Sequence, residues 1–153
     1  MEKILYVMCG PAGCGKTTLI ENSCTPNSRH VSRDKIRFAL IEERGGDYFD
    51  HEKEVFARFA EEIDKAEERI VYADATHLTK RSRAKLLNAI NTTKFDRIVA
   101  VGFSKTLDIL LHQNEKREGL AKVPTSAIKR MHEQYEPPTC AEGFDEVRTI
   151  YGG

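Results

Sequence analysis

Short apolar runs alternate along the chain with longer segments in which apolar residues recur every three or four positions. Short apolar runs are typical of strands buried on both faces, and the longer period is typical of amphipathic helices. We expect strands at residues 3–9, 29–32, 70–73, 97–103 and 146–151. Because strands and helices alternate, the pattern predicts an α/β fold with a parallel sheet of about five strands.

Helices are expected in the periodic segments at residues 16–23, 34–43, 50–69, 79–91, 107–116 and 124–136. Gly45 and Gly46 end the second helix, and Pro124 opens the last one, since proline suits a first turn. A charged loop at 118–123 separates the last two helices. No repeat or linker interrupts this order, so a single domain over residues 1–153 is predicted.

Composition narrows the class of protein. The 153 residues are 40% hydrophobic and 31% charged, as in globular domains. No apolar stretch approaches the roughly 20 residues of a membrane span, and residues 1–4 do not resemble a signal peptide. We therefore expect a cytoplasmic protein with no membrane partner. The four cysteines form no CxxC pair, which disfavours a disulfide framework or a cysteine-bound metal.

Charge is balanced overall, with 24 basic and 24 acidic residues, but it is unevenly distributed. Residues 42–68 hold 11 acidic and 4 basic side chains, whereas residues 69–133 hold 13 basic and 6 acidic ones. A basic half can attract polyanions even when the net charge is zero. Solvated helix faces explain the same pattern equally well.

A glycine-rich segment after the first expected strand matches the pattern GxxxxGK[ST]: Gly10, Pro11, Ala12, Gly13, Cys14, Gly15, Lys16 and Thr17. A buried strand before it and a helix after it are the context of a P-loop, whose backbone N–H groups surround phosphates. We expect these residues and Thr18 to bind ATP. Lys16 would neutralise the β- and γ-phosphates, and the Thr17 hydroxyl would coordinate Mg²⁺.

A second candidate site follows the second expected strand, where Asp34 and Arg37 open a helix. Residues just beyond a parallel strand line the ligand crevice, so Asp34 is expected beside the P-loop. Its carboxylate could accept the proton of an attacking hydroxyl, and Arg37 could hold an anionic group of that acceptor. In the alternative, Asp34 caps the helix and Arg37 is an exposed surface residue.

The third candidate site ends the strand at residues 70–73. Asp74 is expected to help Thr17 hold Mg²⁺, Thr76 to bind on the acceptor side near the phosphates, and His77 is interpreted as structural. Four basic residues follow at a helix start, where the helix dipole does not favour them: Lys80, Arg81, Arg83 and Lys85. A phosphate-rich partner and a solvated helix face both explain this run.

The fourth candidate is a charged segment at 114–124, which contains Gly119 and joins two helices. It is typical of a lid that closes over a triphosphate and excludes water. Arg117 is the candidate for stabilising charge on the transferred phosphoryl group. Lys122 and Arg130 are weaker candidates, for which an exposed surface position is the better interpretation.

Together these segments resemble the 5′-hydroxyl kinase domain of the phage-type polynucleotide kinases, within the small P-loop kinase family. The resemblance covers about residues 4–135, and its more specific features are the Arg33-Asp34-x-x-Arg37 box and the lid. It implies a P-loop kinase-like parallel sheet flanked by helices, with a helical lid. It also implies that ATP's γ-phosphate passes to the 5′-hydroxyl end of RNA or DNA.

The resemblance assigns roles to particular residues. Lys16 and Thr17 would serve ATP and magnesium, Asp34 would be the general base, Arg37 would bind the acceptor's phosphate, and Arg117 would contact the donor phosphates. One position departs from the family. The phage enzymes can carry an acidic residue immediately before the Thr of the third box, but this chain has Ala75 there and Asp74 one residue earlier. Asp74 could therefore order the arginines, the metal or both.

Two other functions stay open. A kinase for a small hydroxylated metabolite, nucleoside or antibiotic is one, because Asp34 would serve any alcohol. The zero net charge and the 8% aromatic content favour it mildly. The other is a nucleotide-dependent switch or ATPase that transfers the phosphate to water or to a partner, although a switch needs no acceptor site. The length leaves no room for a fused 3′-phosphatase or ligase, so a role in nucleic acid repair would be limited to the kinase step.

Overall fold

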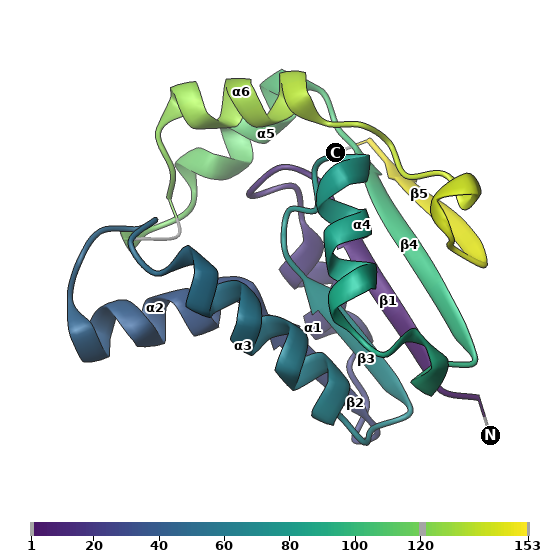
Figure 1. Ribbon diagram of the computed structural model, residues 1–153. Helices are drawn as coiled ribbons and strands as arrows, with labels where there is room; N and C mark the ends of the chain where they lie inside the picture. The colour runs from purple at the N-terminus through teal and green to yellow at the C-terminus, as the bar shows by residue number, and fades with distance from the viewer. Residues whose placement is uncertain (1, 120–121, 153) are drawn as a thin grey trace.

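A five-stranded parallel sheet forms the centre of the protein, seen in a computed structural model that describes residues 2–119 and 122–152 (Figure 1). The spatial order of the strands is β2-β3-β1-β4-β5, and all four pairings are parallel. The strands are β1 (Ile4–Cys9), β2 (Ser28–Ser32), β3 (Ile70–Asp74), β4 (Arg97–Ser104) and β5 (Glu146–Tyr151). The predicted α/β fold with about five parallel strands is confirmed.

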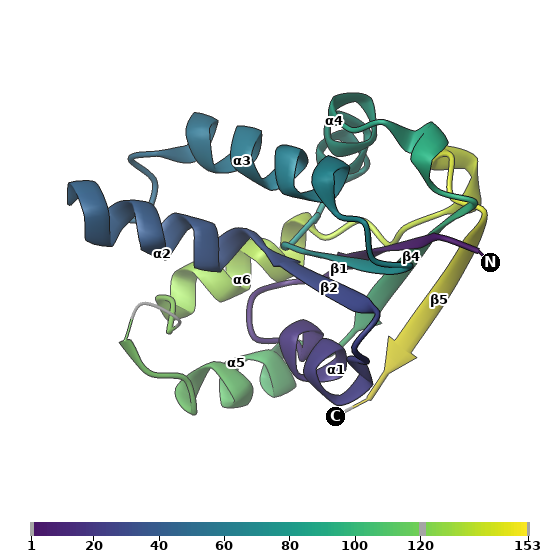
Figure 2. The same cartoon turned by 90° about the horizontal axis from the view of Figure 1, so that it is seen from below.

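Helices cover both faces of the sheet (Figure 2). On one face, Phe59 of α3 and Leu86 of α4 pack against the β1 side chains Leu5 and Val7. On the other face, helices α1, α5 and α6 pack against Met8 and its neighbours. The helices are α1 (Lys16–Ser23), α2 (Arg33–Arg44), α3 (Glu52–Lys65), α4 (Lys80–Ala89), α5 (Leu107–Glu115) and α6 (Thr125–Gln134), with short 3₁₀ turns η1 (Thr92–Lys94) and η3 (Cys140–Glu142).

The strand order brings the chemistry-bearing loops together. Since β1 lies between β3 and β4, the loop after β1 borders the ends of both neighbours. The register pairs Ser32 at the end of β2 with Asp74 at the end of β3. The candidate segments after β1, β2 and β3 therefore meet at one edge of the sheet, where open parallel sheets bind ligands.

The helix expected at residues 50–69 was predicted too long, because α3 ends at Lys65. Ala66 already has extended backbone angles, although its N–H still bonds to the carbonyls of Glu62 and Ile63. The chain leaves the helix there because it must start the next strand pairing, in which the Ile4 N–H donates to the Arg69 carbonyl at 2.8 Å. The strand pairing that follows thus ends the helix earlier than the helical periodicity of this segment predicts.

No helix within the described ranges has the length and apolar character needed to cross a bilayer. All four cysteines are free thiols, with Cys9 and Cys14 buried in the core beside the P-loop. Burial raises the pKa of the Cys9 thiol to about 12, so this group stays protonated and apolar in character.

Candidate active site

A cavity of about 290 Å³ opens where β1, β2 and β3 end. Most of the predicted site residues line it: Ala12, Gly13, Gly15, Lys16, Thr17, Thr18, Asp34, Arg37, Asp74, Thr76 and Arg117. Gly10, Pro11 and Cys14 belong to the same loop but do not line the cavity. Residues that were not predicted as site residues line it as well: Ser32, Arg33, Tyr48, Phe49, Glu52, Ala75 and Met131.

Glycine is required at particular points of the P-loop. Gly13 and Gly15 have φ angles of 80° and 107°, in the left-handed region that other residues avoid. A Cβ at Gly10 would lie only 2.7 Å from the Cys14 sulfur. Gly15 is also the N-cap of α1 and offers no side-chain cap, so the first N–H groups of that helix are available to an anion at the cavity.

The Lys16 ammonium lies inside the P-loop. Its Nζ donates to the carbonyl oxygens of Gly10 at 2.7 Å and Pro11 at 2.9 Å, and the side chain is buried. Carbonyl partners satisfy the donors of a buried ammonium without neutralising its charge. The positive charge therefore stays at the cavity wall, beside the helix N-terminus that faces the same space.

Asp74 joins the P-loop to β2. Its Oδ2 accepts hydrogen bonds from the Thr17 hydroxyl and from His30 Nε2, both at 2.8 Å. Burial opposes ionisation, but the His30 hydrogen bond, the Lys16 charge and the Thr17 hydrogen bond outweigh it and lower the pKa of Asp74. The carboxylate is therefore ionised at neutral pH and directed at Thr17. The arginines of α2 are not among its described partners, so Asp74 does not order them by direct contact, and its role toward Mg²⁺ stays a prediction.

Asp34 is not the cap of α2, because that position belongs to Ser32. The Ser32 hydroxyl oxygen accepts the Lys35 N–H at 3.2 Å, while Asp34 stands in the first turn. One oxygen of Asp34, Oδ1, accepts hydrogen bonds from Tyr48, at 3.0 Å, and from Arg37 Nη1. Its side chain is 42% exposed toward the cavity, so the carboxylate is held in place and still accessible.

Arg37 is buried, in contrast to the exposed position of the alternative interpretation. Its Nε and Nη2 donate hydrogen bonds to the two carboxylate oxygens of Glu52 at 2.9 and 2.7 Å. The Cζ atom of its guanidinium lies 4.3 Å from the Tyr48 ring centroid. Burial opposes ionisation of Glu52, but the hydrogen bond from Arg37 outweighs it and lowers the Glu52 pKa. Arg33 Nη2 reaches the same carboxylate at 3.4 Å. Glu52, rather than Asp74, therefore orders both arginines.

The segment predicted as a lid contributes Arg117 to the cavity. The Arg117 side chain lies over the P-loop, 3.5 Å from where a Cβ of Gly13 would stand, and its Nη1 is buried without a hydrogen-bond partner among the described residues. Lys122 and Arg130 are exposed and line no part of the cavity. Residues 120 and 121 of the predicted lid lie outside the described residues.

Asn114 joins the two ends of the segment predicted as a lid. Its side-chain amide donates to the Val123 carbonyl at 2.7 Å and its side-chain oxygen accepts the Val123 N–H at 3.1 Å. Helices α5 and α6 consequently lie side by side at the P-loop end of the sheet (Figures 1 and 2). The Ala12 N–H points at the Met131 sulfur of α6 at 3.5 Å, which ties this helix pair to the P-loop.

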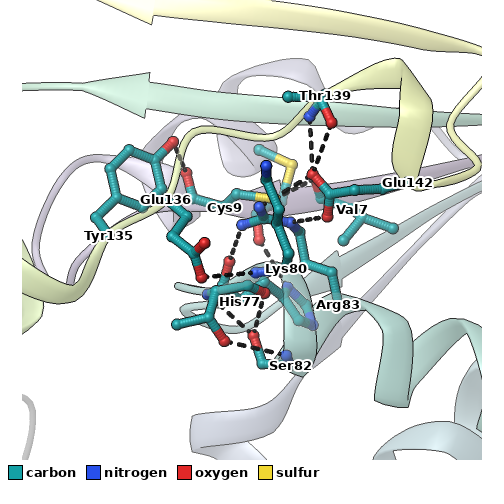
Figure 3. Close-up of polar contacts among 12 residues, drawn as sticks. Val7, Cys9, His77, Lys80, Ser82, Arg83, Tyr135, Glu136, Thr139 and Glu142 are labelled. Atoms are coloured by element: carbon teal, nitrogen blue, oxygen red, sulfur yellow. Dashed lines mark hydrogen bonds and ion pairs between the residues drawn. The ribbon is translucent and has the colours of Figure 1, made fainter.

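The basic run after β3 does not act as a unit. Arg83 is completely buried, where its Nε and Nη2 bind the two oxygens of Glu142 at 2.7 and 3.1 Å and its Nη1 binds the His77 carbonyl at 2.8 Å (Figure 3). For Arg83 both earlier interpretations, a polyanion contact and a solvated face, are therefore wrong. Lys80, Arg81 and Lys85 are exposed.

His77 lies in the core, where its Nδ1 donates to the Met8 carbonyl at 2.7 Å. Burial lowers the pKa of His77 to about 4, so the imidazole is neutral at neutral pH.

The residues of the cavity fit ATP and magnesium. The glycine turns and Arg117 Nη1, which has no hydrogen-bond partner in the part of the chain that the structure describes, offer donors for phosphate oxygens, while Thr17 and Asp74 are oxygen ligands of the kind that Mg²⁺ prefers. No group of three His, Cys, Asp or Glu side chains that could hold a metal occurs in residues 2–119 and 122–152. A site of one hydroxyl and one carboxylate suits Mg²⁺, which usually takes its other ligands from water and substrate phosphates.

His30, Tyr48 and Glu52 were not predicted as site residues. The sequence carries no local signal for them, because each acts on a partner that lies 14 to 44 residues away along the chain. Strand pairing of β2 with β3 brings His30 to Asp74. Packing of α3 against α2 brings Glu52 to Arg37.

Comparison with known proteins supports the same kind of fold. A family model with the description AAA domain matches residues 5–138. No curated protein matches the sequence. Among solved structures, a fungal RNA kinase aligns with a TM-score of 0.66 and 17% identity, over 98% of this chain and 38% of its own. A chain of the Pnkp1/Rnl/Hen1 RNA repair complex aligns with a TM-score of 0.63 and 22% identity, over 87% and 44%.

A sugar kinase from Janibacter sp. aligns as well, with a TM-score of 0.66 and 15% identity, over 99% of this chain and 86% of its own. The present chain thus spans less than half the length of the two RNA-related proteins and most of the length of the sugar kinase. At these identities the likenesses show the P-loop kinase fold and leave the acceptor undetermined.

Proposed function

The chain belongs to the AAA domain family and has a P-loop kinase fold, and from this premise we propose that it transfers the γ-phosphate of ATP to the 5′-hydroxyl end of RNA or DNA. The likeness to two solved structures, an RNA kinase and an RNA repair complex, supports an acceptor of this class. The cavity supports it through its two halves, one suited to a triphosphate and one to a hydroxyl acceptor.

The donor half consists of the P-loop, the first turn of α1 and Arg117. Backbone N–H groups and Lys16 would hold the β- and γ-phosphates, and Arg117 would neutralise charge that develops on the transferred group. Thr17 and Asp74 would hold Mg²⁺, which when bound supplies positive charge to the phosphate oxygens. His30 keeps the Asp74 carboxylate directed at Thr17.

The acceptor half is built around Asp34. In the proposed reaction the acceptor oxygen forms a bond to the γ-phosphorus, the bond from that phosphorus to the β,γ-bridging oxygen breaks, and ADP leaves. The proton of the acceptor hydroxyl passes to Asp34. Tyr48 and Arg37 both bind Oδ1 of this carboxylate, which leaves Oδ2 for the substrate.

The wall around Asp34 is the observation that carries the proposal. Arg37 makes four hydrogen bonds with Glu52, Asp34 and Tyr48, which leaves one of its five N–H groups for a phosphate of the acceptor. Phe49 lines the same wall, and 65% of its surface is exposed. Its ring packs edge-on against the Tyr48 ring, with the two ring centroids 4.7 Å apart. An exposed aromatic ring next to a cation suits a nucleobase with a phosphate attached to its ribose.

A kinase for a small hydroxylated metabolite is the second candidate. The similarity to a sugar kinase over 99% of this chain and 86% of that protein favours it. Asp34 would serve a sugar hydroxyl equally well, so the two candidates differ in what surrounds the hydroxyl rather than in the base.

An acceptor screen tests the proposal. The purified protein is incubated with Mg²⁺ and ATP labelled in the γ-phosphate, together with 5′-hydroxyl RNA and DNA oligonucleotides or a panel of sugars and nucleosides. We expect label on the 5′ end of an oligonucleotide, and none with a Lys16→Ala variant, which controls for contaminating kinases. Turnover of a sugar or nucleoside without transfer to any oligonucleotide would refute the polynucleotide proposal and favour the second candidate.

A further inference from the structure

A second hollow, of about 340 Å³, adjoins the acceptor half of the active site. It lies between Phe56 of α3 and the first turns of α4, where Ser82 and Lys85 line it. Two of its lining residues, Arg33 and Thr76, also line the active-site cavity. The two spaces are therefore neighbours with a shared wall.

The second hollow is a groove, and its lining is basic. Arg33 and Lys85 flank the ring of Phe56, with the Arg33 Cζ 5.7 Å and the Lys85 Nζ 4.5 Å from the ring centroid. The described residues that line the groove include no carboxylate, and His77 is neutral there at neutral pH because burial lowers its pKa to about 4. The groove consequently presents the Lys85 ammonium and the Arg33 guanidinium, whose charge is partly offset by Glu52, to whatever enters it.

Arg33 connects the charge of the groove to the active site. Its Nη2 contacts Glu52 at 3.4 Å, which offsets part of its charge, but its Nε is buried without a hydrogen-bond partner among the described residues. A buried N–H without a partner is costly unless a ligand completes it. Lys85 is exposed on α4, where its ammonium can follow a flexible ligand.

The position of the groove, next to the acceptor half of the active site, fits a polymer. A nucleotide whose 5′-hydroxyl lies at Asp34 carries its 3′-phosphate on the far side of the ribose, and each further nucleotide adds one more phosphate along the strand. A basic groove next to the acceptor pocket meets this need. A small sugar or nucleoside that fits at Asp34 would leave the groove unused.

We propose that the groove between α3 and α4 binds a downstream phosphodiester of a polynucleotide acceptor through Arg33 and Lys85. The inference rests on the proposed function and narrows it, because it makes the preferred acceptor an oligonucleotide rather than a single nucleotide. Lys85 is then a residue that determines specificity for acceptor length and takes no part in the transfer itself.

Steady-state kinetics of Lys85→Ala test this inference. The acceptors are a nucleoside 3′-monophosphate, a dinucleotide and a pentanucleotide, each with a 5′-hydroxyl. The wild-type protein should favour the longer acceptors. The variant should lose about fivefold in kcat/KM for the pentanucleotide, mostly through KM, and change little with the nucleoside 3′-monophosphate. The slope of log KM against log salt should fall by about 0.7 with the pentanucleotide.

Arg81→Ala is the matched control, since it removes the same charge from the same exposed helix but lies outside the groove. Lys85→Glu should lower pentanucleotide turnover further, and thermal unfolding shows whether each variant is folded. Equal losses with Arg81→Ala, or an equal loss with the nucleoside 3′-monophosphate, would refute the groove. A wild-type protein that phosphorylates oligonucleotides without any preference for length would refute it too, and leave the proposed function standing. Absence of transfer to all oligonucleotides would instead refute the proposed function.

Discussion

The carboxylate of Asp34 depends on neighbours that hold it without covering it. Tyr48 and Arg37 donate to the same oxygen, and Glu52 in turn grips Arg37 through two hydrogen bonds. Such support is what keeps a general base within hydrogen-bond reach of its substrate. Burial and the Asp34 charge raise the pKa of Tyr48 to about 12, so its hydroxyl stays a donor at neutral pH.

At the residue scale, we predict that Asp34→Asn nearly abolishes phosphate transfer while ATP still binds. The amide keeps the size of the side chain but cannot accept a proton, and loss of a general base costs about 100- to 10,000-fold in kcat. Single-turnover transfer with labelled ATP measures the rate, and fluorescence titration with an ATP analogue measures binding. Wild-type rates in this variant would remove Asp34 from the role of base.

Some of this site was visible in the sequence and some was not. The P-loop and the Asp34 box could be predicted because each is a local motif placed directly after an apolar strand. Glu52 could not be predicted, because its position 15 residues from Arg37 has meaning only after α3 packs on α2. Arg83 was misinterpreted for a similar reason, since its partner Glu142 is 59 residues away.

At the scale of elements, the helix pair α5 and α6 is held by one side chain. Asn114 pairs with both the N–H and the carbonyl of Val123, and so fixes the loop that carries Arg117. Because Arg117 Nη1 is buried over Gly13 without a described partner, the orientation of this loop decides whether the guanidinium can meet a phosphate.

We predict that Asn114→Ala raises the KM for ATP and lowers kcat together, by about tenfold in kcat/KM, because two backbone groups of Val123 lose their partners and the Arg117 loop loosens. The free energy of unfolding should fall by about 1–3 kcal/mol. His112→Ala, an exposed change on the same helix, is the control. Steady-state kinetics and limited proteolysis of residues 115–124 measure the effect. Unchanged kinetics and unchanged cleavage would show that the predicted lid does not need the two hydrogen bonds between Asn114 and Val123.

At the scale of the whole molecule, a buried polar network connects the sheet to the C-terminal segment (Figure 3). His77 binds the Met8 carbonyl of β1, Arg83 joins the His77 carbonyl to Glu142, and the Tyr135 hydroxyl approaches the Cys9 carbonyl at 3.4 Å. These contacts hold the segment after α6 against the sheet, and the chain then continues into β5. The end of β1 and the segment that leads to the last strand therefore share one support.

This network predicts a pH dependence of stability. The unfolded chain takes up a proton on His77 near pH 6.5, whereas burial lowers the folded pKa to about 4. Between these values the unfolded state binds more protons, so stability falls as the pH drops through this window, by about 3 kcal/mol in total. The contribution is fully present above pH 6.5.

His77→Asn tests this prediction, because asparagine keeps an N–H donor, tolerates the positive φ of 42° and does not titrate. Urea unfolding of both proteins at pH 7 and pH 5 measures the effect. The wild-type protein should lose about 2 kcal/mol more than the variant over this interval, since all other titrating groups are common to both. Identical losses would show that His77 is not the responsible group.

The sequence alone determined the order of strands and helices, the P-loop and the position of Asp34 after β2, because periodicity, glycine turns and strand ends are local properties that a short segment carries by itself. Only the tertiary structure decided that Ser32 caps α2, that Asp74 serves Thr17 while Glu52 orders the arginines, and that Arg83 is buried. It alone also placed Lys85 beside Phe56 and Arg33 in one basic groove. These features join residues far apart in the chain, so they exist only once the sheet order and the helix packing have brought the partners together.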